Sequence, residues 1–158
     1  MTFEKENFLR TRFISLLQQL DPATAPRWGK MNVQQMTEHF ADMVRWANGK
    51  VKHETIHTPP ERLQAYREFL MSDKPFKENT KNPLMNEQPE PVKHKTAQAA
   101  IGELHEELIH FFEMFEKNPQ LIIRNPIFGD LNFEQSIQLL HKHAVHHLRQ
   151  FGLEPLTA

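Results

Sequence analysis

Cysteine is absent from this chain of 158 residues. Its absence excludes disulfides, thiolate nucleophiles and thiolate metal sites, and it leaves histidine and carboxylate as the strong ligand types. Any thiol chemistry would therefore need a thiol supplied as a cosubstrate. A chain of this length can bury a sizeable core without a disulfide or a structural metal. We expect a single domain over residues 1–158, in which a bound metal would be functional.

The chain also lacks an excess of charge of either sign and has no long apolar run. The formal net charge is -1, which gives no electrostatic footprint for nucleic-acid binding. No uninterrupted apolar run approaches the ~20 residues that span a bilayer, and the first residues, Met1–Glu6, are charged and lack the apolar stretch of a signal peptide. These features predict a cytoplasmic protein with no nucleic-acid or membrane partner.

Four segments carry apolar residues at steps of three and four, the pattern of amphipathic helices. They cover residues 8–20, 32–47, 96–117 and 132–151. Asparagine followed three residues later by glutamine predicts a capping box at the start of the second and fourth segments, and Gly152 offers a C-cap for the last one. No segment has a convincing strand pattern. We therefore predict an all-α fold, a four-helix bundle.

The second and third segments are joined by a long connection, residues 48–95. Thr58, followed by two prolines and Glu61, predicts the N-cap of a short extra helix that runs to about Met71. The rest of the connection, residues 72–95, contains four prolines and is expected to be irregular. Irregular segments of this length are often functional. We expect this one to wall the site and to determine specificity.

One pattern occurs twice along the chain. The segment Trp28–Gln35 matches Phe128–Gln135 as aromatic, Gly, any residue, apolar, Asn, two further residues and Gln. Both copies stand directly before a predicted helix. We interpret them as two instances of one favourable helix start, with an apolar residue and an asparagine cap. A pseudo-repeat of two helix pairs is the alternative.

The last predicted helix holds four histidines, His141, His143, His146 and His147. His143 and His147 are one turn apart and project from the same face, close enough to share a metal ion. Placing each residue at about 100° around the helix puts His147 inside the apolar stripe and His143 at its edge. The same construction leaves His146 well outside the stripe and places His141 toward its opposite edge, so both flank the pair.

His39 is the histidine of the second helix, and it faces the core beside Met36 and Phe40. Together with the pair it would form a facial set of three nitrogens with an open position for water or substrate. The alternative is that all three are interior histidines bonded to carbonyls or carboxylates, and spacing alone does not place His39 against the pair. The remaining histidines fall in predicted loops or beside the seam of the third helix: His53, His57, His94, His105 and His110.

Other metal sites fit the sequence less well. A ferritin-like di-iron bundle needs a Glu-x-x-His motif on each of two helices, and among the predicted helices only the third has one, Glu107–His110. A hemerythrin-like site needs ligands on all four helices, and the first helix has no histidine. The histidine pair of the last helix lacks the zincin His-Glu-x-x-His pattern, because Ala144 follows His143.

These residues resemble the DinB-like metal-binding four-helix bundle superfamily, which has an inward histidine on a helix preceded by Trp28-Gly29 and a last helix like His143–Gln150. The chain is more similar to its DUF1569 branch, whose C-terminal signature is similar to Asn125–Leu131 followed by His143–Phe151. The resemblance covers most of the chain. It implies a divalent metal, zinc or nickel, held by His39, His143 and His147.

Relatives in the wider superfamily include thiol-dependent S-transferases and a mycothiol-dependent isomerase, and others look like metal hydrolases. The resemblance implies an enzyme that acts on a small-molecule substrate by means of metal-activated water or a low-molecular-weight thiol. A non-enzymatic helical metal-binding or interaction protein is the alternative. Gln150 is a candidate support for the site, and Arg149 is expected to form an external ion pair. An apolar face of the bundle could also support a homodimer.

Overall fold

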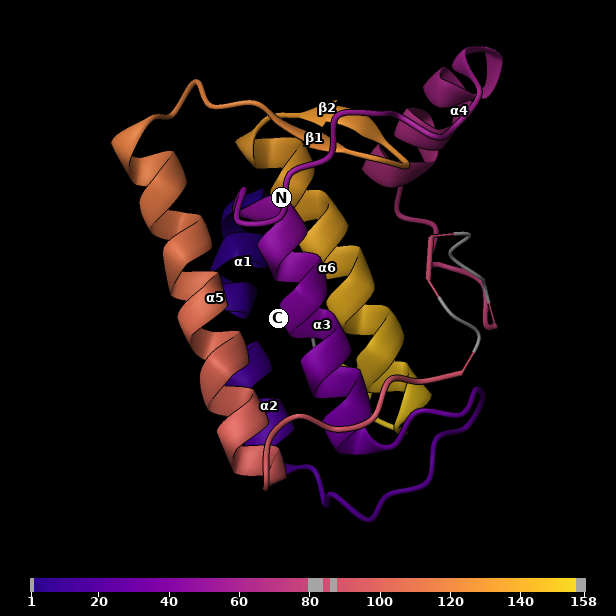
Figure 1. Cartoon of the computed structure of the whole chain (residues 1–158), viewed down its shortest axis with the longest axis vertical. Helices are drawn as coiled ribbons and strands as arrows, with labels where there is room; N and C mark the ends of the chain where they lie inside the picture. The colour runs from indigo at the N-terminus through magenta and orange to yellow at the C-terminus, as the bar shows by residue number, and fades with distance from the viewer. Residues whose placement is uncertain (1, 80–83, 86–87, 156–158) are drawn as a thin grey trace.

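The computed structural model describes residues 2–79, 84, 85 and 88–155. Its elements in chain order are α1 (Thr2–Asn7), the π-helix η1 (Phe8–Arg12), α2 (Phe13–Gln19), α3 (Val33–Ala47), α4 (Pro60–Met71), α5 (Ala97–Lys117), β1 (Ile123–Asn125), β2 (Gly129–Leu131) and α6 (Phe133–Gln150). The run from α1 to α2, together with α3, α5 and α6, packs in the manner of a bundle (Figure 1). The four predicted helical segments and their bundle packing are thereby found in the structure. Helix α4 lies at one end of the bundle, beside the strands.

The first helical run differs from the helix predicted over residues 8–20. It begins at Thr2 and contains the π-helix η1, where the backbone N–H of Phe13 donates to the carbonyl of Phe8. A π-turn brings residues five positions apart onto one face. Phe8 and Phe13, which are five positions apart, are both buried, with ring centroids 6.1 Å apart.

Both predicted capping boxes are confirmed. The Asn32 side chain accepts from the backbone N–H of Gln35 at 2.8 Å, and the Gln35 side chain accepts from the backbone N–H of Asn32 at 2.9 Å. Asn132 and Gln135 repeat this exchange at 2.9 and 3.0 Å. Each box satisfies two backbone donors that the first turn leaves without a partner, so α3 and α6 begin at defined residues.

The extra helix α4 is confirmed, but Thr58 is not its N-cap. Pro59 occupies that position without a side-chain cap, and the Thr58 hydroxyl donates instead to the carbonyl of Ile127 at 2.6 Å. Arg67 in the middle of α4 donates to the carbonyls of Phe128 and Asp130 at 2.8 and 2.9 Å. The hydrogen bonds of this segment therefore fix α4 to the loop before α6.

A small antiparallel hairpin corrects the expectation of an all-α fold. Strands β1 and β2 pair with Ile123 opposite Leu131 and Asn125 opposite Gly129. The Asn125 side chain accepts from the backbone N–H groups of Ile127 and Phe128 at 2.8 and 2.9 Å, and Gly129 supplies a φ of +83°. Three residues per strand are too few to show an alternating pattern in the sequence.

Two apolar clusters hold the elements together. The larger one lies between the four bundle segments and includes Phe13, Phe40 and Phe111, each 0% exposed. The smaller one consists of Leu70, Phe128, Leu131 and Leu139, with Phe76 and Ile127 packed against it. The smaller cluster attaches α4, the hairpin and the chain after α4 to α6.

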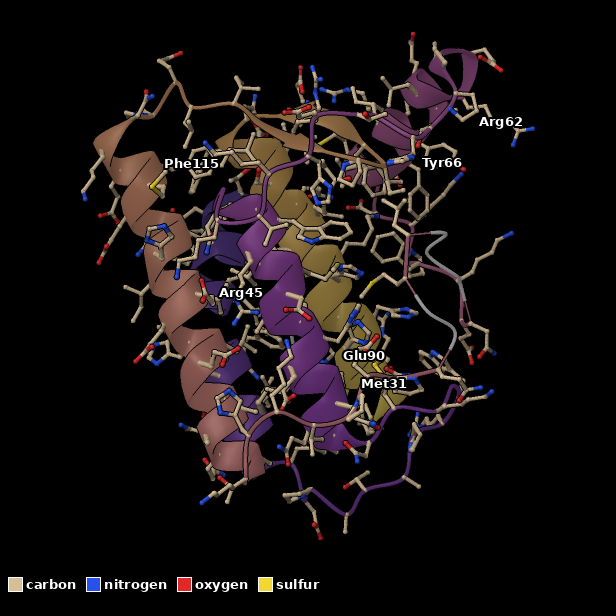
Figure 2. The ribbon with its side chains drawn as sticks, in the orientation of Figure 1. Met31, Arg45, Arg62, Tyr66, Glu90 and Phe115 are labelled. Carbon is tan, nitrogen blue, oxygen red and sulfur yellow. The ribbon has the colours of Figure 1, made fainter. Side chains whose placement is uncertain are left out.

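A polar cluster joins α3 to α5 alongside the core. Arg45 of α3, which is labelled in Figure 2, forms ion pairs with Asp42, Glu103 and Glu107. Burial raises the pKa of Glu107, but the hydrogen bonds from Lys50 and Asn48 and the charge of Arg45 outweigh it, so the net shift is downward. Glu107 of α5 therefore stays ionised and binds Arg45 of α3.

The predicted irregular segment has neither helix nor strand at its described positions, residues 72–79, 84, 85 and 88–95. Residues 80–83 and 86–87 lie outside the described residues. The chain returns to the bundle along α3, where the Glu38 carboxylate accepts from the backbone N–H groups of Lys93 and His94 at 2.7 and 3.1 Å. Across the described ranges, each helix is too short or too polar to span a bilayer.

Candidate metal centre

Helix α6 presents two candidate ligands on one face. The ring centroids of His143 and His147, one turn apart, are separated by 5.5 Å. His147 is 4% exposed, and His143 is partly buried. The helix alone sets this geometry, because side chains at i and i+4 project side by side.

His39 reaches the pair from α3. Its ring centroid lies 5.3 Å from that of His147 and 6.2 Å from that of His143. Each of the three imidazoles offers a nitrogen, and these three atoms all lie within 4.8 Å of one another. The structure thus brings together the three histidines that the sequence singled out.

Aromatic side chains surround the three rings. Phe40 has its ring centroid 6.0 Å from that of His143 and 6.2 Å from that of His147. Phe76 covers His143 from the irregular segment, with the centroids 5.1 Å apart. The cluster therefore lies in apolar surroundings that limit its contact with water.

Burial keeps these imidazoles neutral. Burial and the neighbouring His39 and His146 lower the pKa of His143 to about 3. Burial also lowers the pKa of His39, although Asp42 opposes the shift, and it lowers the pKa of His147 well below the usual range. A neutral imidazole keeps the lone pair that a metal ion needs.

One atom of the cluster tests whether a metal fits. The Nδ1 atom of His147 lies 2.9 Å from the side-chain oxygen of Gln150, whereas its Nε2 atom is buried without a hydrogen-bond partner. A buried polar atom without a partner costs free energy. A cation that accepts lone pairs would give this atom a partner, and two further neutral imidazoles lie beside it. The residues present therefore suit a divalent metal.

The other histidines of α6 are placed differently. His141 packs against Phe8, with centroids 5.3 Å apart, on the side of α1 and η1. His146 lies between Trp28 and Phe76, at 5.4 and 5.9 Å, next to the cluster without contributing a nitrogen to it. Both positions agree with the prediction that these two histidines flank the pair.

The histidines outside α6 and His39 stand apart from the cluster. His94 contacts the Glu103 carboxylate, and His53 packs against Trp46 with centroids 4.4 Å apart. His105 is exposed on α5. Glu107, the carboxylate of the discounted di-iron motif, is bound to Arg45 and Lys50 instead.

Sequence reasoning missed the group that places Phe76. Lys142, which is 7% exposed, donates to the carbonyl of Ser72 at 2.9 Å and to that of Lys74, and Gln138 donates to Ser72 at 3.2 Å. These bonds fasten the chain just before Phe76 to α6. A lone phenylalanine in a polar, proline-rich segment was the available signal.

Two residues of α6, Arg149 and Gln150, follow the pair His143 and His147. Arg149 forms an ion pair with Glu154 at 3.1 Å, as expected of an external residue. Gln150, the candidate support for the site, contacts His147 through its amide and also donates to the carbonyl of Trp28 at 3.0 Å.

Comparison of the chain with models of known families, with curated proteins and with solved structures gave no match. The site is therefore interpreted from its own geometry.

Proposed function

We propose that the protein is a divalent-metal-dependent enzyme that acts on a small molecule, with His39, His143 and His147 as the ligands. One observation carries this proposal: three buried or partly buried imidazoles each offer a nitrogen within 4.8 Å of the other two, and the buried Nε2 atom of His147 has no hydrogen-bond partner. Three protein ligands with a remaining position for water or substrate are the arrangement of catalytic zinc sites.

Within the metals that imidazole ligands suit, the resemblance favours zinc or nickel. Imidazole nitrogen suits zinc, copper, iron and nickel, and the chain has no cysteine to supply a softer thiolate. Among the neighbours of the three rings, Phe40 and Phe76 add no further donor. Neutral ligands would leave the full charge of the ion available to a bound reactant.

A bound divalent ion would lower the pKa of a water or thiol and polarise a substrate carbonyl. The residues of the chain hold the ligands neutral, orient them from two helices and exclude bulk water with Phe40 and Phe76. This set supports hydrolysis and thiol transfer equally, and a thiol would come from a low-molecular-weight cosubstrate. The net charge of -1 favours a small-molecule substrate over nucleic acid.

Membership in the DinB-like superfamily, in its DUF1569 branch, is part of the proposal. Its support is the pattern of Trp28-Gly29, His39 and the run His143–Gln150, on helices that pack as a bundle. A homodimer through an apolar bundle face is likewise proposed on the resemblance alone.

Metal analysis of protein purified without a histidine tag tests the proposal. We expect about one zinc or nickel ion per chain in the wild type, and loss of that metal in His143→Ala, because the substitution leaves only two protein ligands. His141→Ala is the matched control, since His141 shares α6 but packs against Phe8. Metal below about a tenth of an equivalent, unchanged by His143→Ala, would overturn the proposal.

The close packing of Phe76 on His143 favours a second candidate, a protein that binds metal without turnover. Cobalt-substituted protein separates the two. Addition of a small thiol should change the visible spectrum of the cobalt if a coordination position is open to reactants, and should leave it unchanged if the site is closed.

A further inference from the structure

The last turn of α6 is tied to the residues before α3 by two hydrogen bonds. The backbone N–H of Arg27 donates to the carbonyl of Gln150 at 2.7 Å, and the Gln150 side-chain amide donates to the carbonyl of Trp28 at 3.0 Å. Gln150 is 3% exposed, so few waters compete for its amide. The amide group is therefore held between Trp28 on one side and His147 on the other.

These contacts fix which way the amide faces. A backbone carbonyl can only accept a hydrogen bond, so the NH₂ group of Gln150 must face Trp28. The carbonyl oxygen of the amide then faces the Nδ1 atom of His147, 2.9 Å away. Because that oxygen can only accept, Nδ1 must carry the proton, and a neutral His147 must leave its Nε2 atom with a free lone pair.

We propose that Gln150 is a positioning residue that sets the tautomer of His147 and thereby aims the Nε2 lone pair at the metal site. The inference deepens the proposed function and rests on it for the metal. It accounts for the buried Nε2 atom that has no partner within the protein. Partners of this kind raise the metal affinity of a ligating histidine by fixing its tautomer and ring orientation.

Gly29 makes room for this arrangement. It has a φ of +77°, and a Cβ atom at this position would lie 3.0 Å from the side-chain nitrogen of Gln150. Gly129, in the second copy of the repeated pattern, has a φ of +83°, and its Cβ atom would lie 3.2 Å from Arg67. Arg67 donates to the carbonyl of Phe128, as Gln150 does to that of Trp28. Both glycines thus have a positive φ and leave room for a side chain that donates to the preceding carbonyl. Only Gly29 does so beside the histidine cluster.

The tautomer can be measured without metal. Proton–nitrogen correlation spectra of isotope-labelled, metal-free protein distinguish a protonated Nδ1 from a protonated Nε2, at a mildly alkaline pH where histidine is neutral. We expect His147 to carry its proton on Nδ1 in the wild type and in Gln150→Glu, which keeps an acceptor facing Nδ1. We expect Gln150→Leu to shift population to the Nε2-protonated form. Gln138→Leu is the matched control, because Gln138 is a buried glutamine of α6 that bonds to Ser72 instead.

Zinc affinity provides the second measurement. Gln150→Leu should bind zinc about ten- to a hundredfold more weakly than the wild type, and Gln150→Glu should recover part of that loss, because its carboxylate accepts from Nδ1 but does not donate to Trp28. Gly29→Ala should weaken zinc binding and shift the tautomer, because its Cβ displaces the Gln150 amide. Gly129→Ala imposes similar backbone strain and should leave both properties unchanged.

The outcomes separate this inference from the proposed function. A wild-type His147 protonated on Nε2, or a Gln150→Leu variant with unchanged tautomer and zinc affinity, would overturn the role of Gln150. Equal effects of Gly29→Ala and Gly129→Ala would show a general loss of stability and would also overturn it. If His147 carries its proton on Nδ1 but the protein binds no metal, the proposed function is rejected, whereas the role of Gln150 in setting the tautomer still holds.

Discussion

Burial lowers the pKa of six histidines among the described residues, which are His39, His53, His141, His143, His146 and His147. An imidazole with a lowered pKa stays neutral in the folded state at pH values where the unfolded chain, with an ordinary histidine pKa of about 6.5, is protonated. The histidines therefore link proton uptake to unfolding.

The metal-free protein should lose stability as the pH falls from about 6.5 to about 4. In this window the unfolded chain binds more protons than the folded one, so the free energy of unfolding falls with decreasing pH. Burial and the charge of Lys5 lower the pKa of His141 to about 4, which places its contribution in this range. Urea denaturation at several pH values measures the slope.

His141→Leu should make that slope shallower, because it removes one titrating imidazole while keeping an apolar contact with Phe8. An unchanged slope would contradict the assignment of His141 to the linkage. The carboxylates of Glu38, Glu103 and Glu107 also have lowered pKa values, and they contribute at lower pH, below the ordinary carboxylate range.

At the scale of single residues, the sequence predicted the three histidines but not the hydrogen bonds of Gln150 beside them. Helical spacing identified His143 and His147, and the apolar stripe of the second helix identified His39. At about 100° per residue, Gln150 falls on the same side of the helix as His143, which precedes it by seven residues. Side chains on a helix lean toward its N-terminus and cover the preceding turn, so Gln150 reaches back to His147 instead.

The side chain of Asn132 helps to fix the start of α6. Asn132 is exposed, and its side chain accepts from the backbone N–H of Gln135. Asn132→Ala should reduce the free energy of unfolding by about 1 kcal/mol, because it leaves a donor of the first turn without a partner. Urea denaturation provides the measurement.

Asn132→Asp is the control, because aspartate keeps the acceptor and its charge suits the N-terminus of a helix. A loss of stability as large in Asn132→Asp as in Asn132→Ala would contradict the capping role. Asn32→Ala at the start of α3 should have an effect of similar size, since its capping box has the same geometry.

The elements were predictable where local chemistry decides them. Periodicity and caps located α3, α5 and α6, and Pro60 located the first turn of α4. Long-range contacts decided the rest. The Thr58 hydroxyl bonds to Ile127 rather than capping α4, and the hairpin depends on the Asn125 side chain and on Gly129. The π-turn at Phe8–Arg12 needed packing of Phe8 and Phe13 on one core, which spacing alone does not reveal.

The histidine cluster draws one ligand from α3 and two from α6, so metal binding should stabilise the whole molecule. Zinc at a free concentration a hundred times its Kd should add roughly 2.7 kcal/mol, or roughly 5–10 °C in Tm for a chain of this size. Thermal unfolding with increasing zinc, and after chelation, measures the shift.

The control for this shift is His39→Ala, which removes the ligand from α3 and leaves the pair on α6. We expect zinc to have little effect on the Tm of this variant. A Tm shift equal to that of the wild type would mean that zinc binds elsewhere on the chain.

Since His39 and His143 are separated by about a hundred residues, a cation held between them would act as a cross-link that closes a long loop. In a chain without cysteine it would take the place of a disulfide, with the difference that a chelator could remove it. Unfolding would require α3 and α6 to separate at the cluster, so escape of the cation and opening of the bundle would become one event. The lifetime of the folded protein would then depend on the supply of metal in its surroundings.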